Sequence, residues 1–128
     1  MRTYLIEPQL VFVPFLKRIL TEAGLQVVAT SDDIDGKEIV AHDPAAVLVD
    51  VDFFERGAPN ALCRIRQAVK TATVIAFSEI DDPNFEAACH ISGATALVSK
   101  RFGAEQFVKA LQAVPGIPAG LRRGAAPA

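Results

Sequence analysis

Four polar side chains each stand at the end of a short apolar run: Glu7, Asp50, Ser78 and Lys100. A carboxylate can attack the phosphorus atom of a phosphoryl donor, which makes Asp50 a candidate nucleophile. The hydroxyl of Ser78 and the ammonium of Lys100 would then bind the negative phosphoryl oxygens. Glu7 would help to hold Mg²⁺, a hard cation that prefers oxygen ligands and bridges phosphate. These four residue types together are what an acyl phosphate site requires.

A parallel sheet would bring these four side chains to one place. Five apolar runs alternate with segments whose apolar residues recur at helical spacing, at residues 3–6, 26–30, 46–49, 73–77 and 96–98. This alternation is typical of βα units around a parallel sheet. The third run is apolar throughout, as expected for a central strand that is buried on both faces. Because reactive groups gather at the carboxyl ends of such strands, the pattern predicts one shared site.

The segments between the strands carry helix signals. The first predicted helix has Pro14 in its first turn, Gly24 after its end, and an apolar stripe made of Phe15, Leu16, Ile19, Leu20 and Ala23. Three residues could cap the second helix: Ser31, Asp32 and Asp33. Pro83 begins a later helix that stops at Gly93, and the last helix covers residues 104–114. Each helix therefore has a predicted start or stop.

Length and composition fit one domain. The chain has 128 residues, a hydrophobic fraction of 51%, a mean hydropathy of +0.29 and a net charge of −2. We expect a domain over residues 1–114 and a flexible tail over the Pro-, Gly- and Ala-rich residues 115–128. The small net charge gives no reason to expect nucleic acid or an anionic membrane as a partner.

The chain also lacks the signals of export. No apolar run approaches the roughly 18 residues that span a bilayer, and the first residues do not have the pattern of a signal peptide. Cys63 and Cys89 are isolated and match neither a disulfide framework nor a metal site, so we interpret both as buried thiols. A cytoplasmic location is expected.

Four short segments together resemble the receiver domain of response regulators in two-component signalling, including the chemotaxis regulators. They are residues 5–7 (LIE), 47–50 (VLVD), 74–78 (VIAFS) and 93–100 (GATALVSK). Each string is weak alone, but their order and spacing match the family over roughly residues 3–114. The resemblance implies a doubly wound, flavodoxin-like (βα)5 fold with a five-stranded parallel sheet in the strand order 2-1-3-4-5.

The resemblance also implies roles. Asp50 would accept a phosphoryl group from a sensor histidine kinase or a phosphotransfer protein, with Ser78 and Lys100 beside it. Mg²⁺ would be held by Glu7, Asp50 and Asp52. Activity would be limited to Mg²⁺-dependent self-phosphorylation and dephosphorylation at Asp50. The protein would signal by contact with a downstream protein, and it could form a homodimer through its fourth helix, fifth strand and fifth helix.

Several positions depart from the family pattern. Pro8 replaces the second of two acidic residues after the first strand, which weakens the expected Mg²⁺ site or removes Mg²⁺ binding. Glu79 replaces a small residue and would repel phosphate at short range. Leu97 replaces the aromatic switch residue. Arg101 replaces a proline, so a trans peptide bond is expected before it. Phe54 stands where the loop after the phosphoacceptor often has proline.

Two functions therefore stay open. The first is a phosphoacceptor receiver, which the four matching polar residues favour. The alternative is a pseudo-receiver that acts as a protein-interaction module without phosphate, which the departures favour. An unrelated flavodoxin-like enzyme is disfavoured because no Gly-rich phosphate loop follows the first strand.

Overall fold

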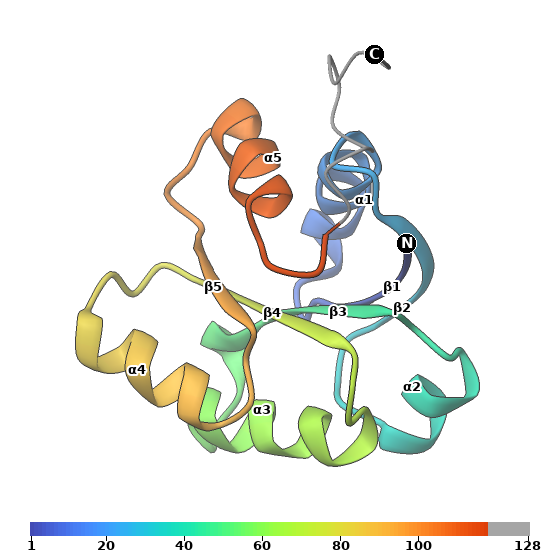
Figure 1. The fold of residues 1–128 in the computed structure, drawn as a ribbon, viewed down its shortest axis with the longest axis vertical. Helices are drawn as coiled ribbons and strands as arrows, with labels where there is room; N and C mark the ends of the chain where they lie inside the picture. The colour runs from blue at the N-terminus through green and yellow to red at the C-terminus, as the bar shows by residue number, and fades with distance from the viewer. Residues whose placement is uncertain (118–128) are drawn as a thin grey trace.

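Five parallel strands form one sheet at the centre of the computed structural model, which describes residues 1–117 (Figure 1). The strands are β1 (Arg2–Ile6), β2 (Gln26–Ser31), β3 (Ala46–Asp50), β4 (Thr73–Ser78) and β5 (Ala96–Ser99). They lie in the order β2-β1-β3-β4-β5, with every neighbouring pair parallel. The predicted fold class and strand order are confirmed.

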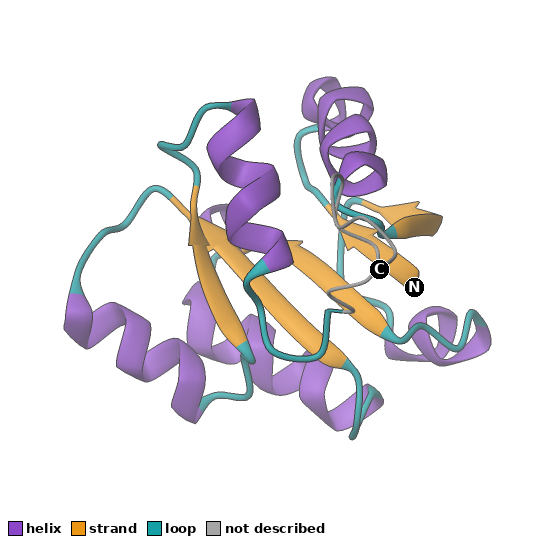
Figure 2. Ribbon diagram, turned by 45° about the horizontal axis from the view of Figure 1, so that its top comes forward, coloured by secondary structure: helices purple, strands orange, loops and turns teal. Residues whose placement is uncertain are grey.

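Helices cover both faces of this sheet (Figure 2). They are α1 (Val13–Glu22), α2 (Gly36–Ala41), α3 (Gly57–Ala68), α4 (Pro83–Ile91) and α5 (Ala104–Gln112). Two short 3₁₀ helices, η1 (Leu10–Phe12) and η2 (Val51–Phe53), follow β1 and β3 almost directly. Helices α1 and α5 lie on one face, and α2, α3 and α4 lie on the other. This arrangement leaves the carboxyl edge of the sheet to loops and 3₁₀ turns.

Each face of the sheet has its own apolar core. Successive side chains of a strand point to opposite faces, so Tyr4 and Ile6 pack on the α2–α4 side while Leu5 packs on the α1–α5 side. The same alternation separates Val47 from Leu48 in β3, where all five residues are buried. Packing on both faces holds β3 in a fixed position in the sheet, and it therefore also fixes the position of Asp50, the last residue of the strand.

The second helix begins later than expected. The side chain of Asp35 caps α2 by accepting hydrogen bonds from the backbone N–H groups of Lys37 and Glu38. The predicted caps at Ser31, Asp32 and Asp33 are therefore wrong. Ser31 is instead the last residue of β2, and Asp33 accepts from the backbone N–H of Ile34 within the connecting turn. These residues form the connection by which the chain leaves the sheet, so the helix can start only after them.

The structure also bears on the predictions for the two cysteines, the end of the domain and membrane-spanning segments. Cys89 is buried, but Cys63 on α3 is exposed, so the expectation of two buried thiols is wrong for Cys63. Ile117 is buried and packs with the α1–α5 core, three residues beyond the predicted domain end. Residues 118–128 of the predicted tail lie outside the described residues. Among residues 1–117, no helix is long and apolar enough to cross a membrane.

The turn between α4 and β5 is fastened to α3 by one arginine. The Arg66 guanidinium donates two hydrogen bonds to the carbonyl oxygen of Gly93, at 2.7 and 3.0 Å, and further bonds to the carbonyls of Val69 and Ala72. Gly93 has a φ of +119°, and a Cβ atom there would lie 2.8 Å from the Cβ of Arg66. A side chain at this position would therefore clash as well as strain the backbone.

We expect Gly93→Ala to lower the free energy of unfolding by about 1–3 kcal/mol, because it combines an unfavourable φ with this close approach. Gly103→Ala is the matched control, since a Cβ at Gly103 meets nothing within 4 Å and the φ is −68°. Its effect should stay below about 1 kcal/mol. Urea denaturation measures both changes, and equal effects of the two variants would contradict the prediction.

Candidate functional site

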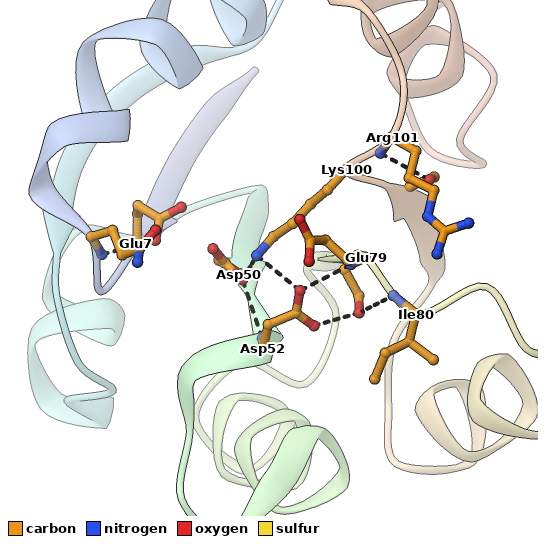
Figure 3. A network of polar contacts seen from close by, with 10 residues as sticks. Glu7, Asp50, Asp52, Glu79, Ile80, Lys100 and Arg101 are labelled. Carbon is orange, nitrogen blue, oxygen red and sulfur yellow. Dashed lines mark hydrogen bonds and ion pairs between the residues drawn. The ribbon is translucent and has the colours of Figure 1, made fainter.

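A buried ion pair joins the ends of β3 and β5. Asp50 is the last residue of β3 and is only 1% exposed. The Nζ atom of Lys100, which follows β5, lies 2.6 Å from Asp50 Oδ1 (Figure 3). The backbone positions the lysine, because the N–H of Lys100 donates to the carbonyl of Ser78 at the end of β4. The sheet order thus brings the Asp50 and Lys100 side chains together, as predicted.

Asp52 forms the second half of the site. Its Oδ2 atom lies 2.9 Å from Lys100 Nζ and accepts a hydrogen bond from the backbone N–H of Glu79. Its Oδ1 atom accepts a short hydrogen bond from the Ser78 hydroxyl. The 3₁₀ turn η2 brings this side chain back over the sheet edge, where the N–H of Asp52 also donates to Asp50 Oδ1. All oxygens of the Asp52 side chain are therefore engaged.

Glu7 enters the site from β1 and is fully buried. The Glu7 N–H donates to the carbonyl of Ser31, which continues the β1–β2 ladder by one residue. Its Oε2 atom accepts from the N–H of Gln9 at 2.9 Å. Glu7 Oε1 and Asp50 Oδ2 are buried and accept no hydrogen bond from any other group of the described residues, while a proton on Glu7 would form a hydrogen bond to Asp50. Figure 3 shows the two carboxylates on neighbouring sides of the site, from separate strands.

The charges of this cluster stabilise one another. Burial alone would lower the pKa of Lys100, but the hydrogen bonds and charges of Asp50 and Asp52 outweigh it and raise that pKa. Burial would raise the pKa of Asp52, but hydrogen bonds from the Ser78 hydroxyl and the Glu79 N–H, together with Lys100, lower it overall. An ammonium and a carboxylate are thus held charged at neutral pH.

Glu7 behaves differently from Asp52. Burial raises its pKa from the usual 4.5 to about 7, a hydrogen bond to Asp50 and the charge of Asp50 add to the rise, and the Gln9 N–H and Lys100 oppose it. Glu7 lacks the direct ammonium contact that Asp52 has. Near neutral pH its side chain can therefore hold or release a proton.

The donor set fits Mg²⁺ through two carboxylates. Mg²⁺ keeps several waters and is commonly bound through one or two carboxylates plus phosphate oxygens. The two partnerless oxygens, on Glu7 and Asp50, are acceptors of this kind. Asp52 is near but occupied, and the described residues contain no group of three or more His, Cys, Asp or Glu side chains placed to hold a metal ion.

A cavity of about 530 Å³ opens beside these carboxylates. Its floor includes Glu7, Asp50 and Lys100. Five apolar side chains, each 40–48% exposed, line it and form what we call the apolar rim: Phe12, Phe15, Phe53, Ile80 and Phe102. Sequence reasoning missed this rim. It placed Phe15 in the apolar stripe of the first helix with Leu16 and Ile19, whereas in the structure Phe15 lies in the first turn of α1, is 40% exposed and lines the cavity.

Of the five positions that depart from the receiver pattern, Glu79 is the one that lines this cavity. Glu79 is exposed and lines it, so its charge faces the approach to Asp50. Pro8 is half-buried beside Glu7. The described residues contain no cis peptide bond, so the expected trans bond before Arg101 is confirmed. Leu97 is partly buried and packs against the α2–α4 core.

Comparison with known proteins identifies the fold. The sequence matches no protein-family model, and it matches no curated protein. The structure is similar to the signal receiver domain of the response regulator NarL from Mycobacterium tuberculosis, with a TM-score of 0.69, 23% identity, and coverage of 86% of this chain and 91% of that chain. The chain has the fold of a response-regulator receiver domain.

Two further structures give the same result. A two-component response regulator of the LuxR family from Aurantimonas sp. SI85-9A1 has a TM-score of 0.73 and 23% identity, covering 88% of this chain and 82% of that chain. HP1043, an orphan response regulator of H. pylori, has a TM-score of 0.67 and 20% identity, covering 88% and 94%. At these identities the likeness describes the receiver fold, whereas function depends on the site.

We expect Lys100→Met to destabilise the receiver fold by about 3 kcal/mol, because it leaves the buried Asp50 carboxylate without its cation. Adding Asp50→Asn to this variant should recover part of the loss. Lys109→Met is the matched control, since Lys109 pairs with Glu105 on the exposed surface of α5 at 3.4 Å. The control should change stability by less than about 1 kcal/mol. Urea denaturation that gives Lys100→Met and Lys109→Met equal effects would refute this role of Lys100.

The raised pKa of Glu7 predicts a pH dependence of stability. Between pH 4.5 and about 7 the folded state keeps a proton on Glu7 that the unfolded chain has released, so this group's contribution to stability falls as pH rises through that window. The slope is at most about 1.4 kcal/mol per pH unit. Glu7→Gln removes this titration. The free energy of unfolding of the variant, relative to that of the unaltered protein, should therefore rise from pH 5 to pH 8. Parallel pH profiles of the two proteins would exclude the effect.

Proposed function

We propose that this protein is a receiver module of a two-component system and that Asp50 accepts a phosphoryl group from a histidine kinase or a phosphotransfer protein. The observation that supports this most is the state of the Asp50 carboxylate. One oxygen is fixed by Lys100 and by the N–H of Asp52, while the other is buried and receives no N–H or ammonium donor from the described residues, and Asp50 lines the cavity. A nucleophile needs this combination of fixed orientation and a free lone pair.

The proposed step is a phosphoryl transfer. An oxygen of Asp50 forms a bond to phosphorus while the bond from phosphorus to the donor breaks, and the donor's leaving group keeps the electron pair. Lys100 and the Ser78 hydroxyl are within reach of the new phosphoryl oxygens if they release Asp52 and Asp50. Mg²⁺, when held by Glu7 and Asp50, would neutralise charge on the phosphate. No further catalytic activity is proposed.

The proposed output is contact with another protein. On α4, α5 and the loop after β5, the exposed polar or charged side chains include His90, Arg101, Gln106 and Lys109. Exchange of Lys100 from Asp50 and Asp52 to a phosphoryl group would move the start of the loop between β5 and α5, which carries Arg101. We propose that a downstream protein, or a second copy of the chain, binds there.

A phosphate-independent interaction module is the second candidate. It is favoured by the bound state of Lys100, which already neutralises part of the acidic cluster, and by Pro8, which supplies no metal ligand. In that case the Lys100 ion pairs would be permanent structural contacts, and binding of a partner would not depend on a modification of Asp50.

Incubation with acetyl phosphate and Mg²⁺, followed by intact-mass measurement, tests the proposal. We expect the mass to rise by one phosphoryl group, because Asp50 has a free oxygen at the cavity. Asp50→Asn should abolish the gain, and Asp81→Asn, which changes an exposed aspartate outside the cluster, should keep it. A gain that survives Asp50→Asn, or no gain in the unaltered protein, would rule out Asp50 as acceptor and leave the phosphate-independent candidate.

A further inference from the structure

The apolar rim is unusual for an exposed part of a protein. Five of the nine large hydrophobic side chains that are exposed in residues 1–117 line this one cavity. Single exposed hydrophobic residues are ordinary, but a contiguous group around a hollow marks a binding site. The group comes from four separate segments, namely η1 with α1, η2, the loop after β4 and the loop after β5. Local sequence bias in one segment does not explain it.

The floor of the cavity provides a second, independent observation. Glu7 is 0% exposed and Asp50 is 1% exposed, and each has one buried oxygen that receives no N–H or ammonium donor from the described residues, so that a proton on Glu7 is what links the two. Both residues line the cavity. A buried acceptor that lacks a partner carries a free-energy cost, which a donor entering from the cavity would remove. The floor thus favours a ligand that donates hydrogen bonds.

The charge of the lining favours a cation. The described residues around the cavity include the carboxylates of Asp50, Asp52 and Glu79, and the Glu7 carboxyl group, which can release its proton near neutral pH, against the single ammonium of Lys100. The aromatic rings add to this preference, because ring faces attract cations. Lys100 Nζ already lies 4.6 Å from the centre of the Phe53 ring and 5.2 Å from that of Phe77. A ligand ammonium or amidinium would meet the same environment.

Size and shape select a small organic molecule. A volume of about 530 Å³, with mostly apolar walls and a few convergent polar groups, falls in the range of small-molecule sites. A hydrated metal ion would satisfy the carboxylates but leave the rim in water. A flat protein surface would cover the rim but leave the two buried oxygens unpaired. A planar apolar body that carries one cationic group satisfies both.

We propose that the cavity beside Asp50 is a binding site for a small organic cation with an aromatic or other planar apolar body. Its cationic group pairs with the free oxygens of Glu7 and Asp50, and its body packs within the apolar rim. This site does not depend on phosphorylation of Asp50. A bound ligand would occupy the space that a phosphodonor or Mg²⁺ needs, so the two uses of the cavity would exclude each other.

Titration calorimetry without Mg²⁺ or phosphodonor tests this site. The probe is naphthylethylamine, for which we expect a Kd on the order of 1 mM or tighter. Naphthylpropionate, which replaces the ammonium by a carboxylate, and ethylammonium, which lacks the rings, should each bind at least about tenfold more weakly. Equal binding of either comparator, or no heat from the amine up to its solubility, would overturn the proposal.

Variants locate the binding. Glu7→Gln keeps the shape of the side chain but removes its charge, and Phe53→Ala removes an exposed ring of the rim; each should weaken amine binding at least about fivefold. Ile91→Ala is the control, because Ile91 is 87% exposed on α4 and does not line the cavity. Circular dichroism checks that all three are folded. Unchanged binding by Phe53→Ala, or equal weakening by Ile91→Ala, would refute the assignment.

Discussion

The contact of Lys100 with two carboxylates is the interaction on which the site depends. Its Nζ atom lies 2.6 Å from Asp50 and 2.9 Å from Asp52, and both aspartates come from the end of β3 and the turn that follows it. Buried carboxylates without a cation would repel one another and lose their water at a large cost. The sheet order makes the contact possible, because β4 alone separates β3 from β5. One ammonium therefore ties together strand ends that are 50 residues apart in the sequence.

Much of the fold could be predicted from the sequence because strands, turns and caps depend on local patterns. The runs before Asp50 and Lys100 have the length and composition of buried strands, and parallel pairing then places their ends at one edge. The rest depended on tertiary contacts. Periodicity put Phe15 on the apolar face of α1, but it did not show that the first turn borders a cavity and leaves this side chain half exposed. Likewise, the bond from Ser78 to Asp52 depends on how the turn η2 folds back.

A polar floor and an apolar rim in one cavity explain why the receiver fold alone does not determine what this chain does. The floor has the residue types for phosphate chemistry, while the rim and the charge of Glu79 alter what can approach it. Fold likeness at 20–23% identity is insensitive to such differences, since it rests on the backbone and the core. The side chains at the edge of the sheet, rather than its architecture, carry the functional information.

The two edges of the sheet are held by different kinds of chemistry. At the amino edge, Arg66 binds the neutral carbonyl groups of Gly93, Val69 and Ala72. At the carboxyl edge, the contacts join charged side chains, and the raised pKa of Glu7 lets that residue exchange a proton near neutral pH. A change of pH near neutrality would therefore alter the charge at one end of the sheet, while the carbonyl contacts of Arg66 at the other end would keep their partners.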